Sequence, residues 1–395
     1  MMNRRQFLIT ASASVAVGAM TSAQGAPESG KYKACVIGDT EAGGYGHSLH
    51  MVFAGRPDVS MLAVADPNEA GRSKRAAECG APRSYADYRE MLEKERPDLV
   101  AIAPRWTLKH KEYFLACADM GAHGIMEKPL CVDLQEADEM MAVLDARKLK
   151  WSIAFNMRAT PTLQHLHKAI CEEGLIGTLL ELRGRGKEDP RAGGEDLIVL
   201  GVHVFDLMAW FTGARPDWCF ADISCNGQPA TPDKVGEATE GLGPIVGDTI
   251  HALFGFRGGV AGYFDSAKNP DTKDTRFGLD LHGSKGIVTI RLGAAPYVAW
   301  LDSPIWTANR LDLQWKAIPG APAFAIHDPQ RETYAPIIRD LISAIEENRE
   351  PQVSLKDGRN ALEMTQAVFE SCVQGGRVPM PLRDRTHPLK RWAAR

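Results

Sequence analysis

The sequence of 395 residues lacks both a long hydrophobic run and an excess of positive charge. The apolar stretch near its start, residues 9–20, is far shorter than the ~20 residues that a membrane-spanning helix needs. The formal net charge of −4 argues against the basic field that nucleic-acid-binding proteins carry. We therefore expect neither a stable membrane anchor nor a nucleic-acid partner.

Metal-binding and disulfide patterns are missing as well. The sequence has no H-E-x-x-H motif, Cys/His cluster or acidic calcium loop, so we expect no metal site. Its eight cysteines include no C-x-x-C pair, and several lie in apolar runs, which favours buried free thiols. Cys219 and Cys225 alone are close enough in sequence to be considered as a disulfide. The length indicates two domains, and 44% hydrophobic residues are typical of a folded soluble protein.

Residues 1–25 are interpreted as an export signal and not as part of the fold. Arg4 and Arg5 precede the short apolar stretch, and small residues near Ala23 offer a cleavage site. The string resembles a twin-arginine signal, which implies the Tat translocon as a partner and a periplasmic or secreted destination. Asn3 departs from the Ser or Thr that is more usual in such signals. The alternative is an ordinary secretory signal with two chance arginines.

Residues 31–150 alternate between strand and helix patterns. Short apolar runs predict strands at residues 33–38, 61–65, 98–103 and 123–126. The segments between them predict helices at residues 48–54, 69–79, 85–94, 107–120 and 133–147. Uniformly apolar strands that alternate with helices are typical of a Rossmann-type, doubly wound parallel sheet.

A glycine-rich loop follows the first predicted strand. Gly38 and Gly43 have the spacing of the first and third glycines of G-x-G-x-x-G, with Thr40 at the second. Alternatively, Gly43, Gly44 and Gly46 form a longer loop. In either case, main-chain N–H groups at the start of a helix can hold a pyrophosphate.

Asp66 ends the second predicted strand, where a carboxylate accepts hydrogen bonds from the ribose hydroxyls of NAD and repels the extra phosphate of NADP. We therefore expect NAD and not NADP. A Rossmann fold without a cofactor, in which Asp66 only begins a turn, is the alternative. Trp106, after the third strand, could stack on a sugar, flank the nicotinamide or simply pack. The predicted cofactor-binding residues are Gly38, Thr40, Gly43, Tyr45, Gly46, Asp66, Pro104, Trp106, Glu127 and Lys128.

The second half is richer in strands. It predicts strands at residues 150–157, 178–186, 218–224, 249–256, 260–266, 276–282 and 286–292, and helices at 160–173, 196–211, 333–346 and 356–373. We expect an α/β domain with a large, mainly antiparallel open sheet and a loop at 226–247. The predicted division is an export signal (1–25), an NAD(P)-binding domain (31–150), a substrate-binding and oligomerisation domain (151–382) and a solvated basic tail (383–395).

Four motifs occur in an order that resembles the Gfo/Idh/MocA family of NAD(P)-dependent oxidoreductases. They are Gly38 to Gly46, Ala65-Asp66-Pro67, Glu127-Lys128-Pro129 and Gly201-Val202-His203-Val204-Phe205-Asp206-Leu207. The resemblance covers essentially all of residues 31–382 and implies oxidation or reduction at a sugar or polyol carbon. It also implies that Lys128 is the central catalytic lysine, and that the open sheet makes a homo-oligomer.

The residues of these motifs suggest acid–base chemistry. A lysine desolvated beside a positive nicotinamide can accept a hydroxyl proton, which is the role expected of Lys128; an ordinary pair with Glu127 is the alternative. The resemblance favours a catalytic or substrate-binding role for His203 over a core histidine. Asp206 would either orient His203 or bond a neighbouring main-chain group. Many family members carry Asp where this sequence has Val199, so the usual proton relay is incomplete.

Polar residues after two strands of the second half could line a substrate pocket, or could form a solvated loop. The predicted substrate residues are Arg158, Arg185, Lys187, His203 and Asp206. We expect an NAD-dependent oxidoreductase that acts on a sugar or polyol with a tightly bound cofactor. An exported glycosidase that uses NAD transiently, by oxidation, elimination, hydration and reduction, and a non-catalytic sugar sensor are the alternatives.

Overall fold

A computed structural model describes residues 30–268, 275–293, 296–307, 309–310, 312–322 and 329–394. The predicted export signal lies outside the described residues. Across the described ranges, no helix is both long and apolar enough to cross a membrane. All eight cysteines are described and each is a free thiol, so Cys219 and Cys225 form no disulfide.

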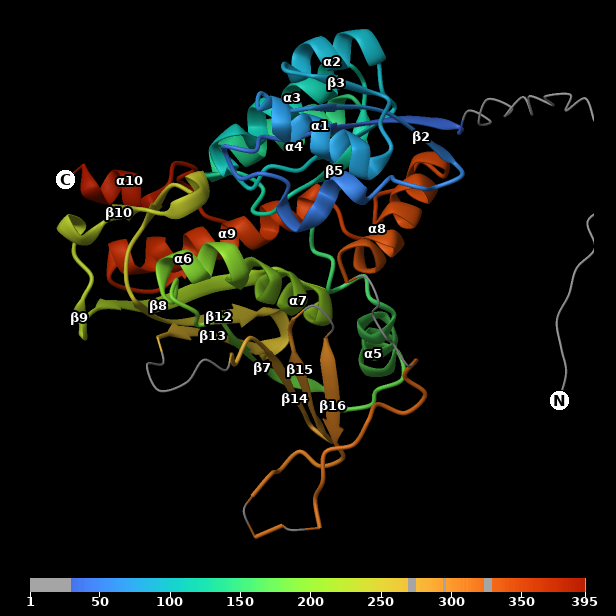
Figure 1. Cartoon of the computed structure of the whole chain (residues 1–395). Helices are drawn as coiled ribbons and strands as arrows, with labels where there is room; N and C mark the ends of the chain where they lie inside the picture. The colour runs from blue at the N-terminus through green and yellow to red at the C-terminus, as the bar shows by residue number, and fades with distance from the viewer. Residues whose placement is uncertain are drawn as a thin grey trace, which may run out of the picture.

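Two sheets frame two domains, which lie one above the other in Figure 1. The strands of the first are β1 (Tyr32–Ile37), β2 (Val59–Ala65), β3 (Arg83–Tyr85), β4 (Leu99–Ile102), β5 (His123–Met126) and β6 (Trp151–Ile153). Its helices are α1 (Glu69–Cys79), α2 (Tyr88–Glu95), α3 (His110–Asp119) and α4 (Leu134–Ala146), with 3₁₀ turns η1 (Gly46–Met51) and η2 (Thr107–Lys109). The strands are all parallel in the order β3-β2-β1-β4-β5-β6, which is typical of dinucleotide-binding domains and confirms the predicted fold class.

The first domain differs from the prediction in three places. Its sheet continues past residue 150, because β6 is its sixth strand. Strand β3 was not predicted, since it has only three residues and none is fully buried. The helix predicted at 48–54 is wrong: η1 is a short 3₁₀ turn in which His47 and Ser48 have φ of 46° and 60°. Positive φ is incompatible with a right-handed α-helix.

The second sheet is mainly antiparallel, as predicted. Its strands are β7 (Leu179–Arg185), β8 (Pro216–Cys225), β9 (Gln228–Pro229), β12 (Thr249–Phe256), β13 (Ala261–Ala267), β14 (Gly278–Gly283), β15 (Ile287–Arg291), β16 (Tyr297–Leu301) and β17 (Val378–Pro379). Among the described strands of this second sheet, only β7 and β13 pair in parallel. The predicted loop at 226–247 holds short pieces, namely β9, β10 (Gly236–Glu237), β11 (Pro244–Ile245), η4 (Pro232–Lys234) and η5 (Thr239–Gly241).

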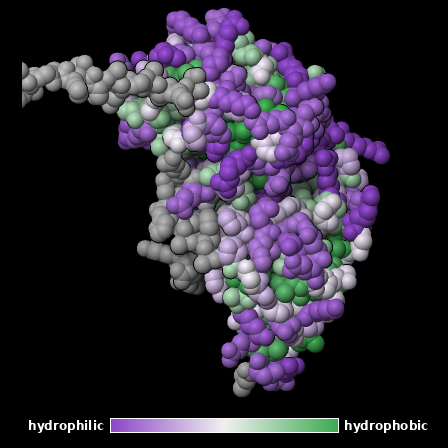
Figure 2. All heavy atoms as spheres, turned by 90° about the vertical axis from the view of Figure 1, so that its right-hand side faces the viewer, coloured by the Kyte–Doolittle hydropathy of each residue, from purple (hydrophilic) through white to green (hydrophobic). Residues whose placement is uncertain are grey.

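Helices α7 (Val202–Thr212) and α9 (Leu355–Gln374) pack against this sheet. The remaining helices of the second half are α5 (Pro161–Cys171), α6 (Gly194–Asp196), α8 (Pro329–Glu346), which packs against η1 and β6 of the first domain, and α10 (Pro388–Ala393). The long helix α9 packs against α7 and β8 of the second domain and against α4 and β6 of the first (Figure 1). It therefore ties the two domains together. Figure 2 shows a largely hydrophilic face with small, separated hydrophobic patches, as expected when the core lies between the sheets and their helices.

The helix predicted at 196–211 is interrupted. Between α6 and α7 the chain forms one turn of π-helix, η3 (Leu197–Gly201). Such turns hold an extra residue and are frequent at functional sites.

The C-terminal tail is not the solvated segment that its basic composition suggested. Helix α10 packs on α9, and the side chain of Leu389 is fully buried. Arg391 forms an ion pair with Glu370 on α9 at 2.5 Å. Positive charges of the tail therefore pair with acidic side chains of both domains, which sequence composition alone does not reveal.

Candidate active site

The loop after β1 is packed closely against the loops that follow β4 and β5. Gly43 has a φ of 86°, and a Cβ at this position would lie 2.4 Å from the main-chain nitrogen of Trp106. A Cβ at Gly46 would lie 2.5 Å from Oε1 of Glu127. These two glycines are therefore required by close approach of neighbouring loops. Gly44 has a positive φ and faces open space.

Asp66 ends β2, as predicted, and its carboxylate holds the glycine-rich loop. Its Oδ2 accepts hydrogen bonds from the main chain of Thr40 at 3.0 Å and from Thr40 Oγ1 at 2.6 Å. Its Oδ1 accepts from the main-chain N–H of Asn68 at 2.8 Å. The carboxylate is fully buried, and Thr40 covers one of its oxygens.

Tyr45 supplies the observation that tests the fit of NAD to this loop. Its hydroxyl is buried without a hydrogen-bond partner, and burial, reinforced by the charge of Asp66, raises the pKa of Tyr45 far above its usual value. An orphaned hydroxyl and a carboxylate beside a glycine-rich loop fit the donor and acceptor needs of a ribose diol and its phosphates. The residues present therefore suit a dinucleotide.

Glu127 and Lys128 follow β5 and are both buried. Glu127 Oε2 accepts a hydrogen bond from the main-chain N–H of Lys128 at 2.9 Å, and Oε1 lies 2.6 Å from Nδ1 of His47. Burial alone would raise the pKa of Glu127, but its contacts with His47 and Lys128 hold that pKa below its usual value. Burial lowers the pKa of Lys128, and the charge of Glu127 offsets only part of this shift.

Lys128 faces the second domain. Its Nζ donates to the main-chain oxygen of Val199 at 3.2 Å, in the π-helical turn. His203, about one turn further on in α7, is only 6% exposed and contacts the rings of Phe155 and Phe277, with ring centroids at 5.5 and 6.5 Å. Burial, with the added charge of Lys128, lowers the pKa of His203 well below its usual value. The structure thus places the two predicted catalytic residues in one region, and burial disfavours the charged form of each.

Arg158 and Asp206 do not join this pair. Arg158 Nη1 lies 2.8 Å from Asp206 Oδ1 and Nη2 lies 2.9 Å from Asp357, and Nη2 also donates to the main-chain oxygen of Gln352. The partner of the Asp206 carboxylate is Arg158, and neither expected role of Asp206 is observed among its hydrogen bonds. An ion-pair cluster that joins the loop before α5 to α7 and α9, with Arg158 and Asp206 buried, favours a structural role for both residues.

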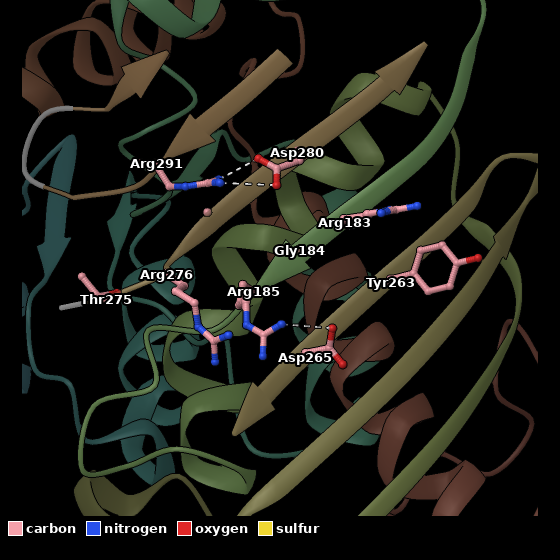
Figure 3. A pocket seen from close by; sticks show the side chains of 10 residues that line it. Arg183, Gly184, Arg185, Tyr263, Asp265, Thr275, Arg276, Asp280 and Arg291 are labelled. Carbon is pink, nitrogen blue, oxygen red and sulfur yellow. Dashed lines mark hydrogen bonds and ion pairs between the residues drawn. The ribbon is translucent and has the colours of Figure 1, made fainter. Parts of the chain in front are cut away.

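Arg185 and Lys187 are also placed away from His203. Along β7, Gly184 faces α7, where a Cβ would lie 2.4 Å from Val204, so Arg185 lies on the opposite face of the sheet. Figure 3 shows Arg185 in a shallow pocket of about 680 Å³ on that outer face, paired with Asp265 at 3.6 Å. Lys187 pairs with Asp189 at 3.5 Å. The alternation of side chains along β7 therefore separates Arg185 from the catalytic pair.

Trp106 packs across the domain boundary. A Cβ at Gly241 in η5 would lie 2.8 Å from its indole ring, which agrees with the packing alternative. Beside it, Arg105 and Glu240 form an ion pair at 3.1 Å. Pro104, at the start of this loop, accepts a hydrogen bond from the ring of His110 at 2.8 Å through its main-chain oxygen.

Sequence reasoning missed three charged or polar residues of this region. The charges of Glu240 and Arg105 act on Lys128, yet they come from loops with no recognisable motif. His47 was missed although it directly follows the glycine-rich loop, a position that is itself a usable signal. Within the described ranges, no group of three or more His, Cys, Asp or Glu is arranged to hold a metal ion.

Comparison with known proteins agrees with this geometry. Residues 33–155 match the family model of the Gfo/Idh/MocA oxidoreductases described as the NAD-binding Rossmann fold, and residues 184–381 match that of the C-terminal alpha/beta domain. The chain belongs to the Gfo/Idh/MocA oxidoreductase family. Its first domain is an NAD-binding domain, and the protein is an NAD(P)-dependent oxidoreductase.

Two relatives in this family illustrate the range. Myo-inositol 2-dehydrogenase from Thermotoga maritima is 24% identical over 322 residues, which cover 80% of this chain and 89% of that enzyme. Levoglucosan dehydrogenase from Pseudarthrobacter phenanthrenivorans is 26% identical over 260 residues, which cover 59% of this chain and 64% of that enzyme. A solved levoglucosan dehydrogenase with NADH and levoglucosan shares the fold, with a TM-score of 0.67, 23% identity and coverage of 89% and 99% of the two chains.

Replacing Asp66 with Asn should relax the preference for NADH over NADPH. The isosteric amide removes the negative charge that would repel the extra phosphate, while one oxygen can still accept from Thr40. We expect the ratio of the two affinities, measured by fluorescence titration, to fall about tenfold. Asp119→Asn, at the exposed last residue of α3, is the control and should leave the ratio unchanged. An unaltered ratio in Asp66→Asn would rule out this carboxylate as the selectivity determinant.

Proposed function

We propose that this oxidoreductase transfers a hydride between NAD and a carbinol carbon of a sugar or polyol. The observation that carries the proposal is that Lys128 and His203 are both buried at the boundary between the NAD-binding domain and the second domain, close enough for the charge of Lys128 to act on His203. The relatives that act on inositol and levoglucosan support a polyhydroxylated substrate.

The side chains at this boundary suit proton transfer. When bound, NAD supplies the hydride acceptor. Because burial lowers the pKa of Lys128, its amine is more often neutral than that of an exposed lysine, and it can take the hydroxyl proton as the hydride leaves. Neutral His203 can hold the same hydroxyl by a hydrogen bond and so fix which face of the carbinol carbon is turned toward the nicotinamide. The rings of Phe155 and Phe277 limit access of water to this histidine.

A glycosidase and a non-catalytic sugar sensor are the alternatives to a dehydrogenase. A glycosidase that regenerates its NAD would release an aglycone without net reduction of the cofactor, and a sensor would bind sugar without turnover. The dehydrogenase relatives favour net oxidation. The absorbance of reduced nicotinamide, followed with purified protein and a panel of polyols that includes myo-inositol, separates the three.

Removing Lys128 or His203 should cut turnover of an active polyol by about 10²–10⁴-fold each, because each change removes a positioned acid–base or hydrogen-bonding group. Affinity for NADH should survive in Lys128→Ala and His203→Ala, since the loop after β1 and Asp66 remain intact. The double variant should be little worse than the poorer single one. Lys111→Ala, which removes an ion pair with Glu139, is the control. Near-normal turnover in Lys128→Ala would overturn the assignment.

Export through the twin-arginine route remains part of the proposal. It rests on Arg4 and Arg5 and on the short apolar stretch that follows them. Changing both arginines to Lys should hold the folded protein in the cytoplasm, as cell fractionation would show. Arrival of the double variant in the periplasm would contradict this route.

We also propose that the outer face of the second sheet pairs with another copy of the chain. Phe220 and Tyr263 are 46% and 39% exposed there, and both flank Leu253 across neighbouring strands. Around them the charged side chains are already paired, as for Arg291 and Asp280 in Figure 3, so less charge has to be desolvated. Sedimentation velocity should find an oligomer that Tyr263→Glu dissociates. A monomeric wild-type protein would exclude this pairing.

A further inference from the structure

Four ionisable side chains meet where the loop after β1, the end of β5 and helix α7 come together. They are His47, Glu127, Lys128 and His203. Glu127 has none of its side chain exposed, and Lys128 and His203 are 4% and 6% exposed. The side chain of His47 is 46% exposed. Of the four, His47 is therefore the one in contact with solvent.

Glu127 fixes the orientation of the His47 ring. Its Oε1 lies 2.6 Å from Nδ1, and a buried carboxylate at this distance favours the tautomer in which Nδ1 carries the proton. Nε2 is then free to accept a proton, and it lies on the ring edge opposite the buried contact. A histidine that is oriented through Nδ1 by a carboxylate and presents a basic Nε2 is the arrangement used for acid–base work in other enzymes.

The backbone holds His47 in this place at a cost. His47 and Ser48 both have positive φ, a backbone conformation that is unfavourable for non-glycine residues and that they adopt rarely. Gly46, the residue before them, has no room for a Cβ because Glu127 lies there. The chain therefore accepts an unfavourable conformation to bring this histidine onto the carboxylate.

The buried pair needs an exit for its proton. Lys128 has the main-chain oxygen of Val199 as its acceptor, and this carbonyl cannot carry a proton onward. The side chain of Val199 is apolar, so residue 199 offers no carboxylate that could accept the proton. His203 is enclosed by Phe155 and Phe277 and is itself shielded from solvent.

We infer that His47, held by Glu127, is a further acid–base residue of this site that carries the proton of the substrate hydroxyl from Lys128 to solvent. The inference rests on the proposed dehydrogenase function. During oxidation, the C–H bond breaks and its hydride goes to NAD⁺, while the O–H bond breaks and its proton goes to the Lys128 amine. The ammonium passes that proton to Nε2 of His47, and the imidazolium releases it to water. Both bases then return to their starting state.

The variant His47→Asn tests the relay with little disturbance of the fold. Asn adopts positive φ more readily than most residues, and its amide can still donate to Glu127, but it cannot carry a proton. We expect turnover of an active polyol to fall about 10²-fold. The affinity for NADH, measured by fluorescence titration, should be unchanged.

Chemical rescue separates proton transfer from a structural effect. His47→Gly is compatible with the same positive φ, and added imidazole should restore part of its turnover. The control is His50→Asn in the same 3₁₀ turn, because His50 pairs with Glu78 at 2.9 Å and lies outside the four-residue cluster. Imidazole should not change the activity of that variant. In the free wild-type protein, ¹⁵N NMR of histidine should find the His47 proton on Nδ1, with the signal assigned by its loss in His47→Asn.

The outcomes distinguish the relay from the function on which it rests. If the wild-type protein oxidises no polyol, the dehydrogenase function fails and the relay fails with it. If the wild type is active and Lys128→Ala is not, but His47→Asn keeps full turnover or His47→Gly gains nothing from imidazole, only the relay is overturned. Loss of NADH binding in His47→Asn would assign His47 to holding the cofactor and would also overturn it.

Discussion

Burial of the Glu127 carboxylate is the constraint on which the rest of the site depends. A carboxylate without solvent contact needs a donor for each oxygen, and a buried group left without one costs about 1–3 kcal/mol or more. One oxygen is met by His47 and the other by the main chain of Lys128. The loop after β1 must therefore reach β5, which explains both the glycine at position 46 and the replacement of a regular helix by a strained 3₁₀ turn.

The second requirement is that the two domains keep their relative position. Lys128 reaches an acceptor only because the π-helical turn of the second domain presents the carbonyl of Val199. Helix α9 contacts both sheets, and the cluster of Arg158, Asp206 and Asp357 joins the loop before α5 to α7 and α9. Removing one partner of a buried ion pair typically lowers the free energy of unfolding by about 3–5 kcal/mol. These charges therefore stabilise the position of the site and do not take part in its chemistry.

The sequence sufficed to predict the alternating strands and helices, the two sheets, and the convergence of Lys128 with His203, since these follow from local patterns and recognisable motifs. It did not predict what depends on partners distant in the chain. Arg158 resembled a substrate residue until Asp357 was seen beside it, and Asp206 shared a helix with His203 but pairs with Arg158. The tail resembled a solvated terminus because its acidic partners lie on α9 and α4.

Position 199 shows how the departures from the family pattern fit together. An Asp side chain there would raise the pKa of Lys128 and favour the ammonium, whereas the Val199 side chain is uncharged and leaves burial to lower that pKa. The lysine is then more often neutral than an exposed lysine, but the proton route that a carboxylate would have provided is gone. A solvent-exposed His47 on a buried carboxylate restores such a route from the opposite domain. Val199 and His47 therefore act together: the uncharged Val199 of the second domain leaves the pKa of Lys128 lowered, and His47 of the first domain takes the proton to solvent.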